Sequence, residues 1–372
     1  MEGVLLMAMS SREKTISRGF RTMCRICCIA AILCPVGAPA QVTHRVLISG
    51  CNLGYLAIVG TNGQFEWKNN DGSVACDSWL LPNGNIVYSY SFGAKIIKPN
   101  FQNSALDVVV WDHRTKSGGE THSCQPLDGS SSKFLIGESF DTVSYIVEVD
   151  TANKEWKRIA LPHFGSGAHG QFRQVRKTPE GTYLVSQETT SGRAFEYDST
   201  GKLLRTFPDG RYSAQRLANG NTLIACGDNH RVIEVDRNNQ IVWQVAQTDI
   251  SGISLGFVAE VVRLSNGNTL ICNWGGHGGS SGAAVIEVTQ DKTLVWSLAA
   301  TIPNYVASVK VLDTPVPVII TPVLKASREL ARQQRGLRLA IGHSLPPEFF
   351  TIQGRIYVPP LSHPPAIMAI IP

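Results

Sequence analysis

Short apolar runs alternate with polar positions along most of the chain, and each run ends at a turn sequence. One turn phrase recurs at Leu81-Pro-Asn-Gly-Asn, Thr178-Pro-Glu-Gly-Thr, Leu217-Ala-Asn-Gly-Asn and Leu264-Ser-Asn-Gly-Asn, with a looser copy at Leu127-Asp-Gly. Asn-Gly and Asp-Gly readily adopt the positive φ that tight hairpin turns require. Alternation of period two on both sides of such turns predicts β-hairpins.

Two further phrases follow each turn and show that the hairpins belong to a larger repeat. The first reads Ile146-Val-Glu-Val-Asp, Ala194-Phe-Glu-Tyr-Asp, Val232-Ile-Glu-Val-Asp and Val285-Ile-Glu-Val-Thr. The second ends in an aromatic residue, at Trp67, Trp111, Trp156, Phe207, Trp243 and Trp296. These aromatics are spaced by about 36 to 53 residues, the repeat length of four-stranded propeller blades. We expect them on outer strands, packed between blades.

The repeat predicts an all-β fold, a six-bladed β-propeller with four-stranded antiparallel blades over 41–314. Five complete units span 76–113, 121–158, 169–207, 212–245 and 257–298. The segment 45–67 supplies three strands and 307–313 supplies one, so the N- and C-terminal strands should share the sixth blade and close the ring. Closure removes exposed sheet edges. Seven blades are the alternative, but no spare segment supplies a seventh.

The two ends of the chain differ from the repeat. Residues 1–40 combine five basic residues, an apolar stretch over 26–36 and Ala38-Pro-Ala40, which together indicate an export signal. We therefore expect a secreted or periplasmic protein. The apolar stretch is too short for a stable membrane span. Residues 315–372 are rich in proline and partly basic, and they are expected to form a largely irregular tail, with a partner- or membrane-binding helix as the alternative.

Composition and cysteine content narrow the function classes. The net charge is only +5, and no basic stripe with interleaved aromatics is present, so a nucleic-acid partner is not expected. A monomer is expected. Five cysteines follow the export signal, and this odd number leaves at least one without an intrachain partner. Cys76, Cys124 and Cys272 lie in apolar segments, where buried thiols are expected.

Strand direction divides the connections between two faces of the ring. The short Asn-Gly turns share one face. Longer, more varied loops share the other, which we call the loop face; they cover 50–54, 90–93, 138–144, 187–193, 227–231 and 273–282. Binding residues concentrate on varied loops held by a rigid scaffold. The loop face is therefore the predicted functional face.

The innermost strands begin at the loop face and place two rings of residues near the axis. The opening positions are Cys76, His122, Arg173, Tyr212, Ala259 and Ala307, and the next positions are Asp77, Ser123, Gln174, Ser213, Glu260 and Ser308. A water-filled channel would explain the polar second ring without any function. His122, Arg173, Tyr212 and Glu260 differ from blade to blade, which favours a functional role for them.

Loop residues complete the candidate site. His169 lies in the Gly-rich segment 165–170, and His230 follows Gly227 by three positions. Asn273, Trp274 and His277 lie in the Gly-rich segment 272–279. His122, His169, Tyr212 and Glu260 are the candidate catalytic residues, with an imidazole as acid or base. Arg173 would hold a carboxylate or sulfate bidentately, and Trp274 would stack on a sugar ring. Asp77, Gln174, His230, Asn273 and His277 are further candidates for ligand binding.

The turn phrase followed by Val-Ile-Glu-Val-Asp and a closing Val-Trp resembles secreted bacterial propellers of the quinoprotein-repeat and arylsulfotransferase-like superfamily over about 76–298. In arylsulfotransferases a histidine before the turn phrase carries the sulfuryl group, and His122, five residues before Leu127, matches its position. The related quinone-dependent dehydrogenases bind calcium beside the quinone. The loop face lacks a clear carboxylate cluster for calcium, so no metal site is expected and no cofactor is identified.

These observations predict a secreted propeller that recognises or processes an extracellular carbohydrate or anionic polymer at the loop face. A small-molecule ligand would fit the same face. Two alternatives remain: an enzyme resembling quinoprotein oxidoreductases or arylsulfotransferases, and a non-catalytic scaffold. One fold supports many functions, so the choice depends on whether His122, Arg173, Tyr212 and His277 converge.

Overall fold

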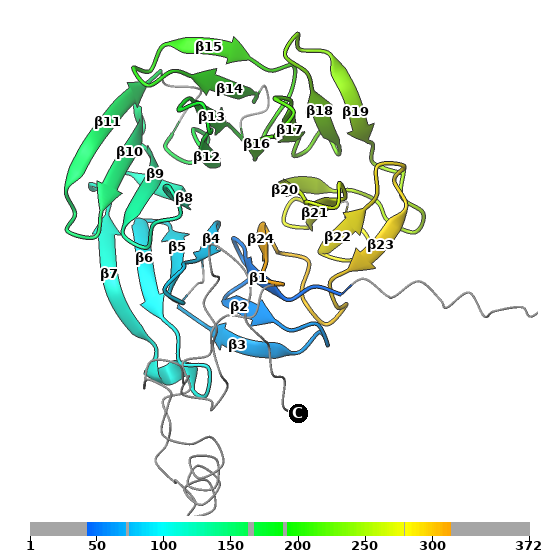
Figure 1. Ribbon diagram of the computed structural model, residues 1–372, viewed down its shortest axis with the longest axis horizontal. Coiled ribbons are helices and arrows are strands. Elements are labelled where there is room, and N and C mark those ends of the chain that lie inside the picture. Colours follow the sequence, from blue (N-terminus) through cyan, green and yellow to red (C-terminus); the bar gives the residue numbers. More distant parts are fainter. Residues whose placement is uncertain (1–42, 72–73, 163–166, 189–191, 279, 314–372) are drawn as a thin grey trace, which may run out of the picture.

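Six small antiparallel sheets stand around a common axis and form a closed ring (Figure 1). The computed structural model describes residues 43–71, 74–162, 167–188, 192–278 and 280–313. Each sheet has four strands, which confirms the predicted six-bladed β-propeller. The predicted export signal and C-terminal tail lie outside the described residues. Within the described part, no helix is long and apolar enough to cross a membrane.

Five blades use consecutive strands, counted from the axis outward. Blade 2 contains β4 (Ser78–Leu80), β5 (Ile86–Tyr90), β6 (Gly93–Lys98) and β7 (Val108–Arg114), with the short 3-10 helix η1 (Ser104–Leu106) between the last two. Blade 3 contains β8 (Glu120–Pro126), β9 (Lys133–Ser139), β10 (Ser144–Asp150) and β11 (Glu155–Leu161). Blade 4 contains β12 (Gln174–Lys177), β13 (Tyr183–Ser186), β14 (Ala194–Tyr197) and β15 (Leu203–Thr206). Blade 5 contains β16 (Ala214–Arg216), β17 (Thr222–Ala225), β18 (Val232–Val235) and β19 (Ile241–Val245). Blade 6 contains β20 (Phe257–Arg263), β21 (Thr269–Trp274), β22 (Val285–Val288) and β23 (Leu294–Ser297).

Blade 1 joins the two ends of the repeat region. Its strands are β24 (Ser308–Val311), β1 (Val46–Ser49), β2 (Leu56–Val59) and β3 (Phe65–Asn69). β24 pairs antiparallel with β1, with Ser308 opposite Ser49 and Val311 opposite Val46. The predicted ring closure is confirmed, because the last strand of the ring lies inside the first blade.

The repeated glutamate of the third strand has a structural role that explains the sequence repeat. In each case a basic group of the next blade reaches it: Lys177 Nζ lies 2.7 Å from Glu148 and Arg263 Nη2 lies 2.9 Å from Glu234. Around the ring the pairs are Glu148 with Lys177, Glu196 with Arg216, Glu234 with Arg263 and Glu287 with His44. These buried or half-buried contacts hold neighbouring blades in register, beside the apolar packing of their faces.

The closing aromatics pack between blades in most units, but one does not. Trp67 and Trp111 are buried and donate their indole N–H to Asp107 and Asn153 of the following blade. Trp156 instead donates to Glu148 of its own blade and is 42% exposed, so its predicted inter-blade packing is wrong. The hydrogen bond to Glu148 holds the Trp156 indole on the outer surface of its own blade.

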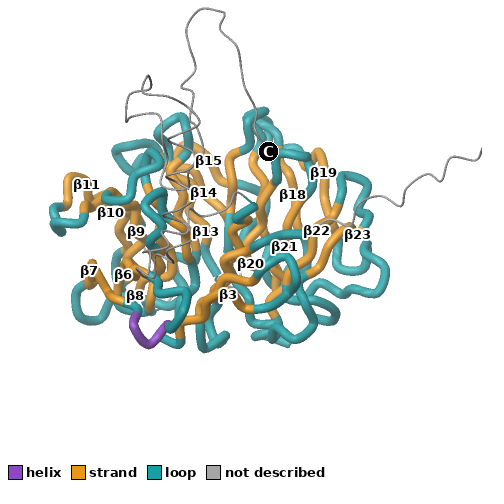
Figure 2. Tube along the Cα trace, turned by 60° about the horizontal axis from the view of Figure 1, so that its bottom comes forward, coloured by secondary structure: helices purple, strands orange, loops and turns teal. Residues whose placement is uncertain are grey.

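The strands run between two faces that carry the connections (Figure 2). The Asn-Gly turns follow the innermost strands, and Gly84 and Gly220 adopt φ of +82° and +84° there. Such angles suit glycine because it has no Cβ. Connections between second and third strands, and links between blades, meet at the loop face, where the site described below lies.

Candidate functional site

A layer of four charged side chains closes the ring axis below the loop face. This axial ion layer consists of Asp77, Arg176, Glu260 and Lys310. Arg176 donates to Asp77 at 2.7 and 3.0 Å and to Glu260 at 3.2 Å. Lys310 Nζ lies 2.7 and 2.6 Å from the two carboxylate oxygens of Glu260. The layer therefore carries two positive and two negative charges, which balance one another.

The axial ion layer contains several candidates from the sequence and gives them contacts between blades. Asp77 accepts from the backbone N–H of Cys124, and Glu260 accepts from the backbone N–H of Val309. Gln174 donates to Glu260 at 3.0 Å. Burial alone would raise the pKa of Glu260, but Lys310 and Arg176 outweigh it and lower this pKa to about 2. Glu260 is therefore ionised at neutral pH.

Bulges in two innermost strands set the direction of the residues at the axis. In β8, Thr121 pairs with Glu138 and Ser123 with Gly137, so His122 is the extra residue. In β20, two residues that include Glu260 interrupt the pairing between Val258 and Val261. A bulge rotates the side chains that follow it and is common beside functional sites.

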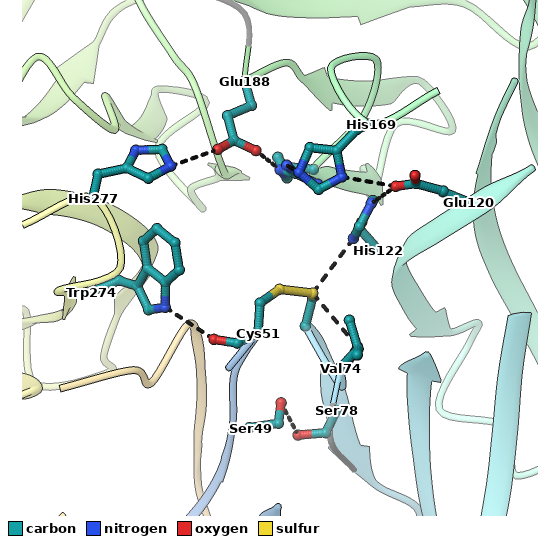
Figure 3. Close-up of a disulfide and its surroundings, with 12 residues drawn as sticks. Ser49, Cys51, Val74, Ser78, Glu120, His122, His169, Glu188, Trp274 and His277 are labelled. Carbon is teal, nitrogen blue, oxygen red and sulfur yellow. Dashed lines mark hydrogen bonds and ion pairs between the residues drawn. A yellow bond between two sulfur atoms is a disulfide. The ribbon is translucent and has the colours of Figure 1, made fainter. Parts of the chain in front are cut away.

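Above the axial ion layer lies a connected set of polar side chains, which we call the site layer (Figure 3). Glu120 Oε2 lies 2.9 Å from His122 Nε2 and 2.9 Å from His169 Nδ1. Arg173 Nη2 lies 2.7 Å from His169 Nε2, and its Nε donates to Glu188. This series of contacts continues at the edge of the loop face. There Glu188 lies 3.5 Å from His277 Nε2, and Asp228 lies 3.1 Å from His277 Nδ1.

The hydrogen bonds of His122 and His169 define which ring nitrogen of each imidazole carries a proton. A guanidinium only donates, so His169 Nε2 accepts from Arg173 and its Nδ1–H donates to Glu120. His122 Nε2–H donates to the same carboxylate, and its Nδ1 lies 3.5 Å from Cys76 Sγ. Burial, with the nearby charge of Arg173, lowers the pKa of His122 to about 4. The hydrogen bond from His122 lowers the pKa of Glu120 to about 2, so this carboxyl group is ionised at neutral pH.

Two donors of the site layer are buried without a hydrogen-bond partner among the described residues. They are Arg173 Nη1 and Tyr212 Oη, on side chains from residues 4% and 5% exposed. Burial raises the pKa of Tyr212, which keeps its hydroxyl protonated. An unpaired buried donor costs about 1–3 kcal/mol, so these two need an explanation.

Aromatic rings form the opposite wall of the site layer. The ring of Phe257 makes edge-to-face contacts with Tyr212, Trp274 and His277, at centroid distances of 5.6, 5.4 and 5.0 Å. Trp274 is buried and donates its indole N–H to the backbone oxygen of Cys51 at 3.2 Å. His277 is the exposed member of this wall.

The structure therefore brings His122, His169, Arg173, Tyr212, Trp274 and His277 together at the loop face. Asn273 and His230 instead hold loops: Asn273 Oδ1 accepts from the backbone N–H of Gly256, and His230 Nδ1 lies 2.8 Å from the backbone oxygen of Gly256.

A disulfide between Cys51 and Cys76 lies directly under His122 (Figure 3). It links the loop after β1 to the start of β4, and thus joins blades 1 and 2. The expectation of a free buried thiol at Cys76 is wrong: its neighbours in sequence predicted burial but could not reveal a partner 25 residues away. Cys124, Cys226 and Cys272 are free and buried.

Several residues of both layers were not predicted from the sequence, although their spacing from predicted residues or their place in a loop could have indicated them. Arg176 and Lys310 follow Gln174 and Ser308 by two positions, and Glu120 precedes His122 by two. Residues two apart on a regular strand point to the same side, so Arg176 and Lys310 could have been assigned to the axis, whereas the bulge at His122 interrupts this alternation beside Glu120. Glu188 and Asp228 lie in loops that were assigned to the loop face.

A separate cavity of about 330 Å³ lies where blade 6 meets blade 1. Its lining includes His44, Gly60, Trp296 and Ala299, and none of the site layer. His44 is already bound to Glu287 and Asp313, at 2.6 and 2.9 Å. This cavity is therefore separate from the site layer.

Comparison with known proteins places the fold among β-propellers. A sequence model of the Mal s 1 allergenic protein-like family matches residues 56–292. A protein of unknown function from Bacteroides caccae is 26% identical with a TM-score of 0.64, over 73% of this chain and 100% of that one. No curated protein matches. The comparisons confirm the β-propeller part of the resemblance noted from the sequence.

Lower-scoring structural matches include two lyases. A streptogramin B lyase is 8% identical with a TM-score of 0.44, over 68% of this chain and 83% of that one. A catalytically inactive virginiamycin B lyase from Staphylococcus aureus with quinupristin is 8% identical with a TM-score of 0.47, over 72% of this chain and 88% of that one.

Proposed function

The chain belongs to the Mal s 1 allergenic protein-like family, and we propose that it is an exported propeller that binds an anionic ligand, an acidic carbohydrate, at the loop face. The observation that carries this proposal is the pair of buried, unpaired donors, Arg173 Nη1 and Tyr212 Oη. Carboxylate or sulfate oxygens that accept from these donors would satisfy them. The intrachain disulfide supports export, because such bonds are typical outside the reducing cytosol.

Arg173 is prepared for this role by its other contacts. Glu188 holds Nε and His169 holds Nη2, which fixes the planar group and leaves Nη1 for a ligand. A fixed guanidinium loses little conformational freedom on binding and matches the geometry of carboxylates and sulfates. In the aromatic wall opposite, His277 is the exposed ring, and it would contact the C–H face of a sugar at the rim of the site.

Processing of the ligand is the second candidate, and the Glu120–His169 pair favours it. The carboxylate fixes the proton on His169 Nδ1, so Nε2 is the basic atom of an exposed imidazole. A ligand anion that draws Arg173 toward itself would free this nitrogen to accept a proton. Sulfuryl transfer on His122 is less favoured, because Glu120 and Cys76 face both of its ring nitrogens.

Binding assays with matched oligosaccharides test the proposal. Calorimetry would compare uronate-containing, sulfated and neutral oligosaccharides of equal length. We expect binding of an acidic class, and a loss of roughly 10-fold or more in affinity for Arg173→Met, since a charged hydrogen bond is removed. Tyr212→Phe should weaken binding by a smaller factor. Arg193→Met, in an exposed residue of the same face, is the control and should bind normally. Equal affinity for acidic and neutral sugars, or for wild type and Arg173→Met, would refute the proposal.

A further inference from the structure

Glu120, His122 and His169 place one carboxylate oxygen and two imidazole nitrogens within 4.8 Å of one another. We propose that these three side chains form a binding site for one divalent transition-metal ion of the zinc class. Two histidines and one glutamate are a ligand set that catalytic zinc sites use, with the fourth position left for water or substrate. The inference goes beyond the proposed function, because the ion would bind in the absence of any carbohydrate.

The spacing of the ligand atoms suits such an ion. Glu120 Oε2 lies 2.9 Å from each of the two imidazole nitrogens that would coordinate, His122 Nε2 and His169 Nδ1. In a tetrahedral zinc site with bonds of about 2.0–2.1 Å, neighbouring ligand atoms are about 3.3 Å apart. Each of the two nitrogens therefore needs to move away from the carboxylate oxygen by only a few tenths of an ångström.

The frame around the ligands is rigid on one side and open on the other. Glu120 and His122 lie two positions apart on innermost strand β8, beside its bulge, and His169 comes from the link to blade 4. The His122 side chain is 4% exposed, whereas that of His169 is 71% exposed. An ion held here would be closed from below and accessible from the loop face, which leaves a coordination position free.

Neutral imidazoles can accept the ion by a change of tautomer, without losing a proton. The proton of His122 Nε2 moves to Nδ1, and the proton of His169 Nδ1 moves to Nε2. The second shift ends the hydrogen bond from Arg173 Nη2 to His169 Nε2, which measures 2.7 Å here. Arg173 then keeps its contact with Glu188 alone. Arg173 thus competes with the ion, while it assists the anionic ligand proposed above.

A second group of possible metal ligands also includes His122, but its two cysteines are joined to each other and cannot bind an ion. Cys51 and Cys76 also lie within 4.8 Å of this imidazole, and their disulfide removes both thiolates. Reduction would create competing ligands, so the experiment below uses no reductant. Zinc that binds under these conditions would then be coordinated by Glu120, His122 and His169.

The test uses the exported chain without a polyhistidine tag, treated with chelator and then titrated. Co²⁺ serves as a spectroscopic probe and Zn²⁺ is followed by calorimetry. We expect one ion per chain and a visible Co²⁺ band of low coordination number. Glu120→Gln and His169→Ala should weaken binding by more than roughly 100-fold, since even loss of an outer-shell partner costs up to about that factor. His230→Ala, in another loop-face histidine, should leave it unchanged.

Arg173→Met separates this inference from the proposed function. It should retain the ion or bind it more tightly, although it loses the acidic oligosaccharide. Zn²⁺ should also raise the melting temperature of wild type and not that of His169→Ala, because an ion that binds only the folded state stabilises it. Wild-type and His169→Ala proteins that bind Co²⁺ equally, or a wild type without stoichiometric binding, would overturn the metal site and leave the oligosaccharide result standing.

Discussion

Lys310 of β24 binds Glu260 of β20 directly, with Nζ 2.7 and 2.6 Å from the two carboxylate oxygens. Both side chains are largely buried at the ring axis. β24 is the C-terminal strand of the ring and lies inside blade 1, so this contact joins the closing strand to blade 6. The same carboxylate also accepts from Arg176 of blade 4. One residue thus connects three blades.

Removal of the Glu260 charge should destabilise the ring strongly. Glu260→Gln leaves Lys310 and Arg176 buried with reduced compensation, and loss of one partner of a buried ion pair typically costs about 3–5 kcal/mol. Urea unfolding should show a free energy of unfolding lower by about 3 kcal/mol. Arg114→Gln removes a highly exposed partner of Asp112 and should leave the unfolding midpoint unchanged. Similar stabilities for wild type and Glu260→Gln would show that the axial ion layer does not hold the ring closed.

Acid should weaken the same contact over a defined pH range. Lys310 and Arg176 hold the pKa of Glu260 at about 2, against about 4.3 for an unfolded glutamate. Asp77 is the second carboxylate of this layer, and Tyr212 and Cys272 are further titratable groups near Glu260. Because the folded-state pKa is the lower one, the stabilisation is complete above about pH 4.3 and is lost as the pH falls toward 2. Urea midpoints measured from pH 6 to pH 2 should therefore fall, and Glu260→Gln should show a shallower decline. Parallel declines would assign the acid sensitivity to other carboxylates.

The disulfide between Cys51 and Cys76 should contribute measurable stability. It closes a segment with a sequence separation of 25, for which the loss of chain entropy in the unfolded state amounts to roughly 3 kcal/mol. Reductant should lower the melting temperature of wild type, but not that of Cys51→Ser/Cys76→Ser, which should already melt at the lower temperature. Peptide mapping without reductant checks the pairing. A wild type that is insensitive to reductant would contradict this prediction.

The fold was predictable because its information is local and repeated. Asn-Gly turns and period-two strands recur often enough to count blades, and unpaired strand segments at 45–67 and 307–313 leave one way to close the ring. The exposure of Trp156 was not predictable, since it depends on whether the indole bonds to its own blade or the next.

The candidate site was predictable only in outline. Strand direction was enough to place His122, Arg173, Tyr212 and His277 on one face. The contribution of Arg176 and Lys310 depends on the width of the ring, which decides whether long side chains meet across the axis. The bulge at His122 contains no glycine that would indicate it, so its effect on side-chain direction was not predictable from the sequence.

Tyr212→Phe should stabilise the protein, and this outcome separates a ligand-binding hydroxyl from a structural one. The Tyr212 hydroxyl is buried and unpaired, so its removal relieves a desolvation cost, and the free energy of unfolding should rise by about 1 kcal/mol. Tyr183→Phe is the matched control: its buried hydroxyl donates to Glu148 at 2.6 Å, so this variant should lose about 1–2 kcal/mol. Urea unfolding of both variants beside wild type makes the measurement. Gains in stability at the expense of binding are expected where a site keeps polar groups ready for a ligand. If Tyr212→Phe instead loses as much stability as Tyr183→Phe, the hydroxyl has a partner in the folded protein and is not reserved for a ligand.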